Sequence, residues 1–136
     1  MTWSGRKARK PSFIGTFAMI AAADLALRHL GFARSVAFVR RVAGSKTGEE
    51  TAPEVVEAVM RRVISASTFY PGRAECLEQS LVAYVLLRRR GVPVQLRLGV
   101  QPYPFHAHAW IELNGRAISE ADDFVSQFVP VEGFAI

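Results

Sequence analysis

The sequence predicts an α+β fold, in which a helical N-terminal part precedes one further helix and an antiparallel sheet. Apolar residues recur at helical spacing up to residue 69. Tyr70-Pro71-Gly72 then marks a loop, and after Pro93 apolar and polar residues alternate as in half-buried strands. We expect a single domain over residues 1–136, with a helical part at 1–69 and a core at 70–136, since this length can bury a core without disulfides.

Three helices are predicted in the N-terminal part. The first runs from an N-cap at Ser12 to about Leu30, where a glycine stops it, and the second spans about 33–43. Thr51 and Glu54 form a capping-box pattern at the start of the third helix, with a proline just inside it. Local signals alone therefore divide this half of the chain into helices.

One helix and three strands are predicted after the loop. The helix covers about 74–87, with three arginines in its last turn, where positive charge suits the helix dipole. Asn114-Gly115 marks a hairpin turn between the second and third strands. The predicted strands are 94–100, 105–112 and 116–120.

The composition narrows the partners and the compartment. The net charge is +5 and the pI is near 10.0, but the basic residues are scattered and do not interleave with aromatic residues, so we expect no nucleic-acid partner. The single cysteine excludes an internal disulfide and argues against a cysteine-based zinc site. It fits the reducing cytoplasm, where we expect the protein to act.

The apolar run at 13–23 follows a basic N-terminus, as a membrane segment would. Asp24, Arg28 and His29 interrupt it before the roughly twenty apolar residues that a spanning helix needs. No small-residue cleavage site for a secreted domain follows. We expect a helix that is buried or faces a partner, and contact with a membrane surface stays open.

Cys76 lies near the start of the predicted helix 74–87. The free backbone N–H groups and the helix dipole at that position favour the thiolate, which is the nucleophilic form. A lone cysteine is most often only a small buried hydrophobic residue. Cys76 therefore becomes a candidate nucleophile only if the fold supplies a base.

His108 is the candidate base. Alternate residues of a strand share a face, so the strand 105–112 has one apolar face and one that looks at a cleft, another layer or solvent. The apolar face holds Ala107, Ala109, Ile111 and Leu113, and the other holds His106, His108, Trp110 and Glu112. A carboxylate should orient the imidazole, and Glu120, Asp122 and Asp123 lie just beyond the hairpin turn.

Two further roles are open to residues near this pair. His106 with Glu120 or Asp122 would form a His-x-His metal site, but a complete ligand set is not evident, and we expect no metal or other cofactor. The backbone N–H of Cys76 is the natural first oxyanion donor. Tyr70 is the candidate for the second.

Segments 76–81, 87–93, 99–100 and 104–112, the last with its His-Ala-His-Ala-Trp strand, resemble the lasso-peptide leader peptidases of the transglutaminase-like superfamily. The likeness covers about residues 70–122. It implies a papain-like core with Cys76 as nucleophile and His108 as base. It also implies an acid twelve residues after the histidine, where the family usually has Asp and this chain has Glu120, with Asp122 in reserve.

The same resemblance implies a function and partners. A cysteine peptidase of this kind removes the leader from a ribosomally made lasso-peptide precursor through an acyl-enzyme, here on Cys76, without a cofactor. The chain looks like the free-standing form of the family, which needs a separate leader-recognition protein and hands the core peptide to a lasso cyclase. Two rivals remain: an acyl transferase of the transglutaminase type, and a basic peptide-binding module without enzymatic activity.

The hairpin at Asn114-Gly115 decides whether Glu120 can serve His108. In a two-residue turn Leu113 opposes Arg116, and Glu120 falls on the wrong face. In a three-residue loop with a bulge at Gly115, Glu112 opposes Arg116 and His108 meets Glu120, with Cβ atoms roughly 5 Å apart. We predict the three-residue loop.

Overall fold

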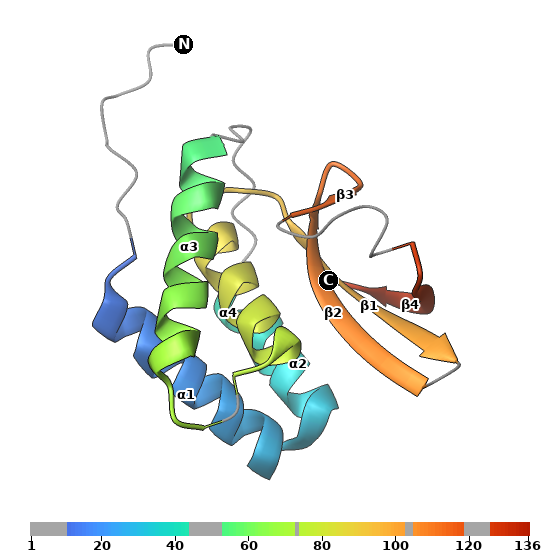
Figure 1. Ribbon diagram of the computed structural model, residues 1–136, viewed down its shortest axis with the longest axis horizontal. Coiled ribbons are helices and arrows are strands. Elements are labelled where there is room, and N and C mark those ends of the chain that lie inside the picture. The colour runs from blue at the N-terminus through green and yellow to red at the C-terminus, as the bar shows by residue number, and fades with distance from the viewer. Residues whose placement is uncertain (1–10, 44–52, 73, 103–104, 119–125) are drawn as a thin grey trace.

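The computed structural model describes residues 11–43, 53–72, 74–102, 105–118 and 126–136. Figure 1 shows the helices gathered on one side of the molecule and the sheet on the other, which confirms the α+β class. The helices are α1 (Phe13–His29), α2 (Gly31–Ala43), α3 (Pro53–Phe69) and α4 (Cys76–Arg89). The strands are β1 (Gln95–Pro102), β2 (Phe105–Leu113), β3 (Arg116–Ala117) and β4 (Val129–Ala135).

The predicted helix boundaries are confirmed to within a few residues. Ser12 caps α1, because its hydroxyl accepts a hydrogen bond of 3.0 Å from the N–H of Gly15. Gly31 takes a φ of 80°, a left-handed conformation that suits glycine, and α2 begins there, two residues earlier than predicted. Helix α3 begins at Pro53 as expected, whereas Thr51 of the predicted capping box lies outside the described residues.

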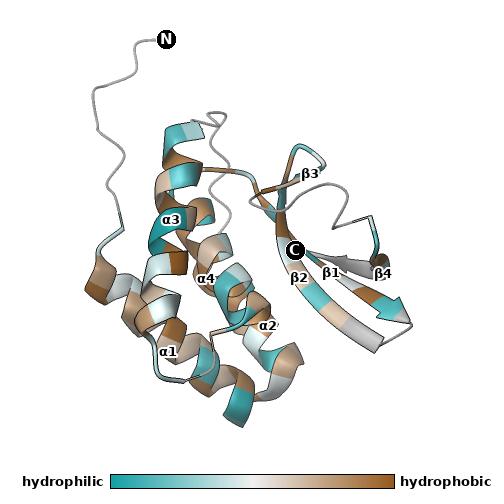
Figure 2. Cartoon of the chain, in the orientation of Figure 1, coloured by the Kyte–Doolittle hydropathy of each residue, from teal (hydrophilic) through white to brown (hydrophobic). Residues whose placement is uncertain are grey.

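Helix α4 is the centre of the core. Every residue from Leu81 to Leu87 is buried, as expected for a helix with neighbours on all sides. The elements around α4 pack fully buried aliphatic side chains against it. Burial of each such side chain stabilises the fold by about 1.5–3 kcal/mol relative to its exposure to water. Among them are Ile20 of α1, Val59 and Val63 of α3, Leu96 of β1 and Ile111 of β2. Figure 2 shows the apolar colour along α4 and on parts of α1 and α3.

The sheet has the order β3-β2-β1-β4, and all neighbouring strands are antiparallel. Strand β4 was not predicted, because Pro130 and a glycine interrupt its apolar pattern. Proline is tolerated there because β4 is an edge strand among the described residues, where a missing N–H breaks no ladder. The third strand is shorter than predicted: β3 covers only Arg116–Ala117, and residues 119 and 120 lie outside the described residues.

The predicted three-residue hairpin loop is wrong. Leu113 pairs with Arg116, and the N–H of Ile118 continues this register with a hydrogen bond of 2.8 Å to the carbonyl of Ile111. Asn114 and Gly115 have φ values of 54° and 79°, the paired left-handed conformations of a type I′ turn, whose twist matches that of the flanking strands. The register argument that aligned an acid with His108 therefore fails.

None of the helices in the described part of the chain is both long and apolar enough to span a bilayer. Helix α1, which carries the apolar run of the N-terminus, instead buries Ile20 and Ala23 against the core. Helix α1 was expected to be buried or to face a partner; one side of it is buried against the core, while Ile14 and Leu25 are exposed.

Candidate functional site

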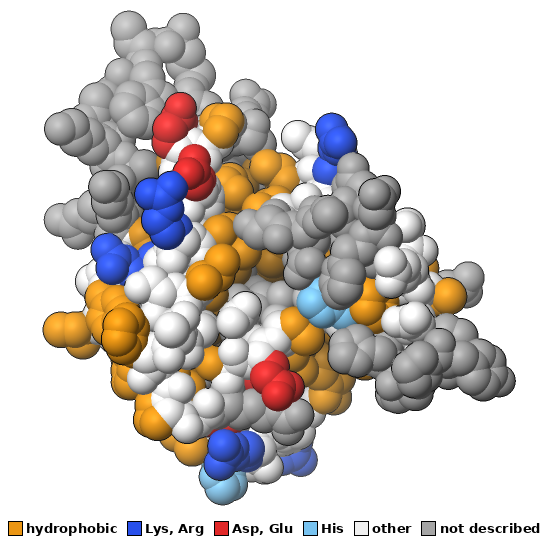
Figure 3. Space-filling model, in the orientation of Figure 1, with side chains coloured by type: hydrophobic (Ala, Val, Ile, Leu, Met, Phe, Trp, Pro, Cys, Tyr) orange, Lys and Arg blue, Asp and Glu red, His pale blue; other side chains and the backbone are white. Residues whose placement is uncertain are grey.

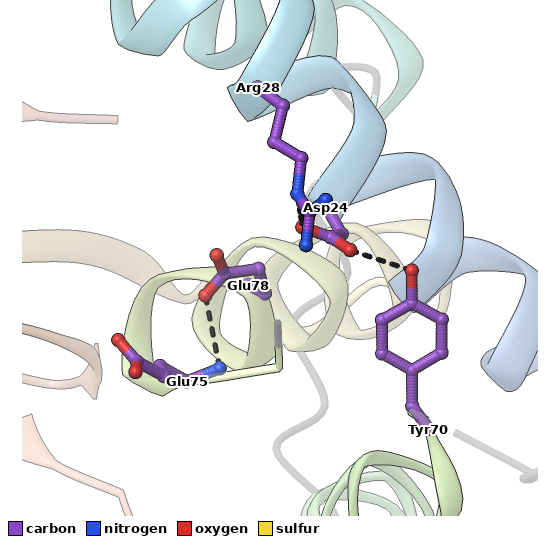
Figure 4. A network of polar contacts seen from close by, with 5 residues as sticks. All are labelled: Asp24, Arg28, Tyr70, Glu75 and Glu78. Atoms are coloured by element: carbon purple, nitrogen blue, oxygen red, sulfur yellow. Dashed lines mark hydrogen bonds and ion pairs between the residues drawn. The ribbon is translucent and has the colours of Figure 1, made fainter. Parts of the chain in front are cut away.

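Cys76 is the first residue of α4. Glu75 is the N-cap, and the carboxylate of Glu78 accepts a hydrogen bond of 3.1 Å from the backbone N–H of Glu75 (Figure 4). The side chain of Gln79 donates a bond of 3.1 Å to the carbonyl of Ala74. Both bonds fix the loop end that delivers the cysteine. The thiol is free and half-buried, at a helix start whose unbonded N–H groups can stabilise an oxyanion.

The side of α4 that carries Cys76 faces β2. Ser80 follows Cys76 by four residues, so the two share one face of the helix. The hydroxyl of Ser80 donates a hydrogen bond of 3.2 Å to the carbonyl of Ala109 in β2. Ala109 is the neighbour of His108 in the strand. Cys76 lies four residues before Ser80, which is about 6 Å along the helix axis at about 1.5 Å per residue. This is its axial distance from the point where α4 contacts β2, next to His108.

His108 lies against an aromatic wall. Its ring stacks on Trp110 at a centroid distance of 6.1 Å and lies 5.3 Å from the ring of Phe128. Trp110 and Phe128 are only 2% and 4% exposed. Gly99 of β1 pairs with His108, and a Cβ at Gly99 would come within 2.7 Å of both aromatic residues. The small residue therefore lets the two large rings close around the base of the imidazole.

The sheet face that holds His108 is not open to solvent throughout. The predicted division of β2 is confirmed for Ile111, which belongs to the helical core, and Leu113, which packs against it. On the other face Trp110 is buried, and its indole N–H donates a bond of 3.0 Å to the carboxylate of Glu112. That face forms a second, aromatic cluster around His108 with Phe128.

The structure brings Cys76 and His108 to neighbouring elements without joining them. Within the described residues no hydrogen bond links the two side chains. Such bonds in unliganded thiol enzymes are often long and tighten when substrate binds. Glu120, Asp122 and Asp123 lie outside the described residues, so the acid stays a prediction.

The metal alternative gains no support. No three of the described His, Cys, Asp and Glu side chains are grouped so that they could hold an ion. The side chain of His106, on which that alternative depends, is not among those described.

A buried carboxylate anchors the loop before Cys76. The hydroxyl of Tyr70 donates a hydrogen bond of 2.7 Å to Asp24 of α1, and Arg28 donates one of 2.9 Å to the other oxygen of the same carboxylate (Figure 4). Asp24 is 2% exposed. The hydrogen bond to Asp24, followed by burial, raises the pKa of Tyr70. The Tyr70 hydroxyl is thus committed to Asp24, and its suggested role as second oxyanion donor is not supported.

Sequence reasoning missed both the Asp24–Tyr70 bond and the position of Phe128. In the sequence Asp24 interrupts an apolar run, and a lone acid in such a run also signals a buried polar contact. Gly72 lies in the same loop, where a Cβ would come within 2.6 Å of Asp24 and 2.7 Å of Tyr70. Phe128 gave no signal, because its partners are distant in the sequence.

The chain is similar to known proteins over most of its length. The profile of the transglutaminase-like superfamily matches residues 18–133. The microcin J25-processing protein McjB of Escherichia coli is 33% identical to the chain over 49 residues, which are 36% of this chain and 24% of McjB. The aligned part thus spans about a quarter of that relative. No solved structure matches the chain.

Proposed function

Because the chain belongs to the transglutaminase-like superfamily, we propose that it is a cysteine peptidase that removes the leader from a ribosomally made lasso-peptide precursor. One observation carries the proposal: the single cysteine starts a helix whose same face is bonded to β2 beside His108. The likeness to a microcin J25-processing protein supports a precursor peptide as the substrate. Figure 4 shows the hydrogen bond that shapes the helix start.

The reaction begins when the Cys76 thiolate attacks the carbonyl carbon of the scissile peptide bond. The carbonyl oxygen becomes an oxyanion that accepts a hydrogen bond from the backbone N–H of Cys76. As the C–N bond breaks, the protonated imidazole of His108 gives its proton to the leaving amine of the core peptide. The leader remains as a thioester on Cys76.

Hydrolysis of the thioester completes the cycle. His108 takes a proton from a water molecule, and the resulting hydroxide adds to the thioester carbonyl. The tetrahedral intermediate expels the thiolate and releases the leader with a free carboxylate. The acid that orients the imidazole is proposed on the family resemblance alone, with Glu120 as the first candidate and Asp122 in reserve. The two-residue turn gives Glu120 no support.

The aromatic wall suits the role of His108 as a base. Trp110 and Phe128 restrict the directions in which the imidazole can turn. A base that is held in one orientation loses less freedom when the transition state forms. The proposal also includes a cytoplasmic setting, a separate leader-recognition protein and a lasso cyclase as partners.

The test is cleavage of the precursor, with the recognition protein of the same system present, followed by mass spectrometry. We expect Cys76→Ala and His108→Ala each to lose nearly all activity, because nucleophile and base act as a unit. Cys76→Ser should also be nearly inactive. His29→Ala is the matched control, since His29 is exposed at the far end of α1. Full cleavage by Cys76→Ala would refute the proposal.

The product mass separates hydrolysis from acyl transfer. A leader with a free carboxylate identifies a peptidase, whereas a leader joined to an added amine identifies a transferase on the same thioester. Absence of both products, with tight binding of the precursor, would instead favour a binding module.

A further inference from the structure

The helical layer contains an apolar groove on the side of α4 that faces away from β2. Its volume is about 150 Å³. Helices α1 and α2 form its walls and α4 its floor. The residues that matter here are Ala22 and Ala26 of α1, Phe38 and Val42 of α2, and Leu81 and Val85 of α4. We refer to it as the α1–α2 groove.

The groove can receive an apolar side chain. A cavity of roughly 150 Å³ lined by aliphatic and aromatic residues is large enough for a benzene ring. Phe38 is 60% exposed and Val42 is 37% exposed, although both are large apolar side chains on a strongly amphipathic helix. The groove is a hollow, whereas the apolar side chains over the start of α1 protrude from the surface as a group, as Figure 3 shows.

Positive charge lies along one flank of the groove. Arg34 and Arg41 stand four residues before and three residues after Phe38, so all three share one side of α2. Both arginines are exposed. The single acidic residue in α1 and α2 is Asp24, which is buried and bonded to Tyr70 and Arg28. Neither helix therefore presents an exposed carboxylate beside these arginines.

These features define the chemistry of an occupant. An apolar ridge would fill the groove, and carboxylates along one side of that ridge would meet Arg34 and Arg41. A second copy of this chain fits badly, because it would bring the same arginines against each other. A flat bilayer surface would not fill a concave groove. An amphipathic helix with acidic residues on one flank satisfies both requirements.

We propose that the α1–α2 groove docks an acidic amphipathic helix of a partner protein, with an aromatic or aliphatic anchor beside Phe38. The groove floor and the catalytic candidate Cys76 lie on different sides of α4, since Cys76 shares its face with Ser80, which is bonded to β2. The docked helix would leave the cysteine uncovered. The proposal therefore stands apart from the proposed peptidase activity.

The experiment uses the full chain and a synthetic amphipathic helix with Leu and Trp on one face and Glu along one flank. Binding is measured by fluorescence anisotropy of the labelled peptide at low salt. We expect the double variant Arg34→Glu with Arg41→Glu to lose roughly tenfold in affinity, because two rim ion pairs become repulsive. Arg40→Glu is the matched control, since Arg40 is exposed on the same helix but points away from the groove stripe.

A second variant tests the groove itself. Ala22→Trp fills the hollow with a side chain of this protein and should weaken binding without changing the charge. Circular dichroism confirms that each variant is folded. Cys76→Ala should bind as the unchanged protein does, so loss of catalysis and loss of docking are separate results.

Three results would overturn the proposal. The first is equal affinity for the same peptide with Lys in place of Glu. The second is no effect of either the double variant or Ala22→Trp. The third is failure to bind the acidic peptide together with binding of phosphatidylglycerol vesicles that depends on Arg34 and Arg41, which would assign the surface to a membrane.

Discussion

Replacement of Gly99 by alanine should destabilise the protein and disturb the candidate base. The added Cβ would lie 2.7 Å from the Cβ of Phe128 and 2.7 Å from the indole of Trp110, a separation that real Cβ atoms essentially never show. Both aromatic side chains are buried and cannot swing into solvent. One of them must shift, and both rings contact His108.

The magnitude follows from two opposing effects. Overpacking in a core costs about 1–3 kcal/mol. Alanine in a strand regains about 0.5–1 kcal/mol relative to glycine, because the unfolded chain has less freedom to lose. The difference between the midpoints of these ranges is a loss of roughly 1.2 kcal/mol in the free energy of unfolding. For a domain of this size, that lowers the Tm by about 3–6 °C.

The assay is thermal unfolding followed by circular dichroism, together with the rate of precursor cleavage. Gln95→Ala in the same strand is the control, because Gln95 is exposed and its loss removes no core contact. We expect the Gly99 variant to show a lower Tm and a lower kcat, since the wall that orients His108 has moved. An unchanged or higher Tm would refute the packing argument.

Three further predictions concern the loop before the nucleophile and the hairpin. Tyr70→Phe should slow cleavage more than it weakens precursor binding, because the loop leading to Cys76 loses its bond to Asp24; equal kcat in both proteins would contradict this. The pKa of Tyr70 is raised by its hydrogen bond to Asp24, so the folded protein holds the phenol proton more tightly than the unfolded chain. That contribution to stability is complete below pH 10.0 and is lost as the pH rises above it, and alkaline unfolding should show a weaker pH dependence in Tyr70→Phe. Gly115→Val should lower stability by about 1–2 kcal/mol, because a β-branched residue resists the left-handed conformation; denaturant unfolding that matches the unchanged protein would be contrary to the turn geometry.

The parts of the fold with strong local signals could be predicted from the sequence. Helix α1 begins after Ser12, whose side chain caps it, and ends before Gly31, whose backbone adopts a left-handed conformation. The helix that starts at Cys76 followed from its apolar pattern and from the glycine after its last turn. Strand β4 could not be predicted, since Pro130 weakens its pattern and its pairing with β1 is a long-range effect.

The parts of the candidate site that lie within one helix or strand could be predicted. The contacts between two separate segments could not. The position of Cys76 at a helix start follows from local sequence. The hairpin loop was predicted wrongly, because the turn chemistry of Asn114-Gly115 selects the two-residue turn whatever acid the site requires. The bond between Tyr70 and Asp24 joins residues 46 positions apart, and no local pattern encodes such a contact.

The burial of α4 on all sides also determines how the two catalytic candidates move. Amide protons of residues 81–87 can exchange with solvent only when the core opens, so this segment should belong to the slowest-exchanging part of the protein. Cys76 is attached to that rigid segment at one end. Strand β2 touches the helix there through Ser80, and His108 of the same strand packs against Trp110. Slow fluctuations of the distance between thiol and imidazole should therefore arise from β2 and its aromatic cluster, while the nucleophile stays in place.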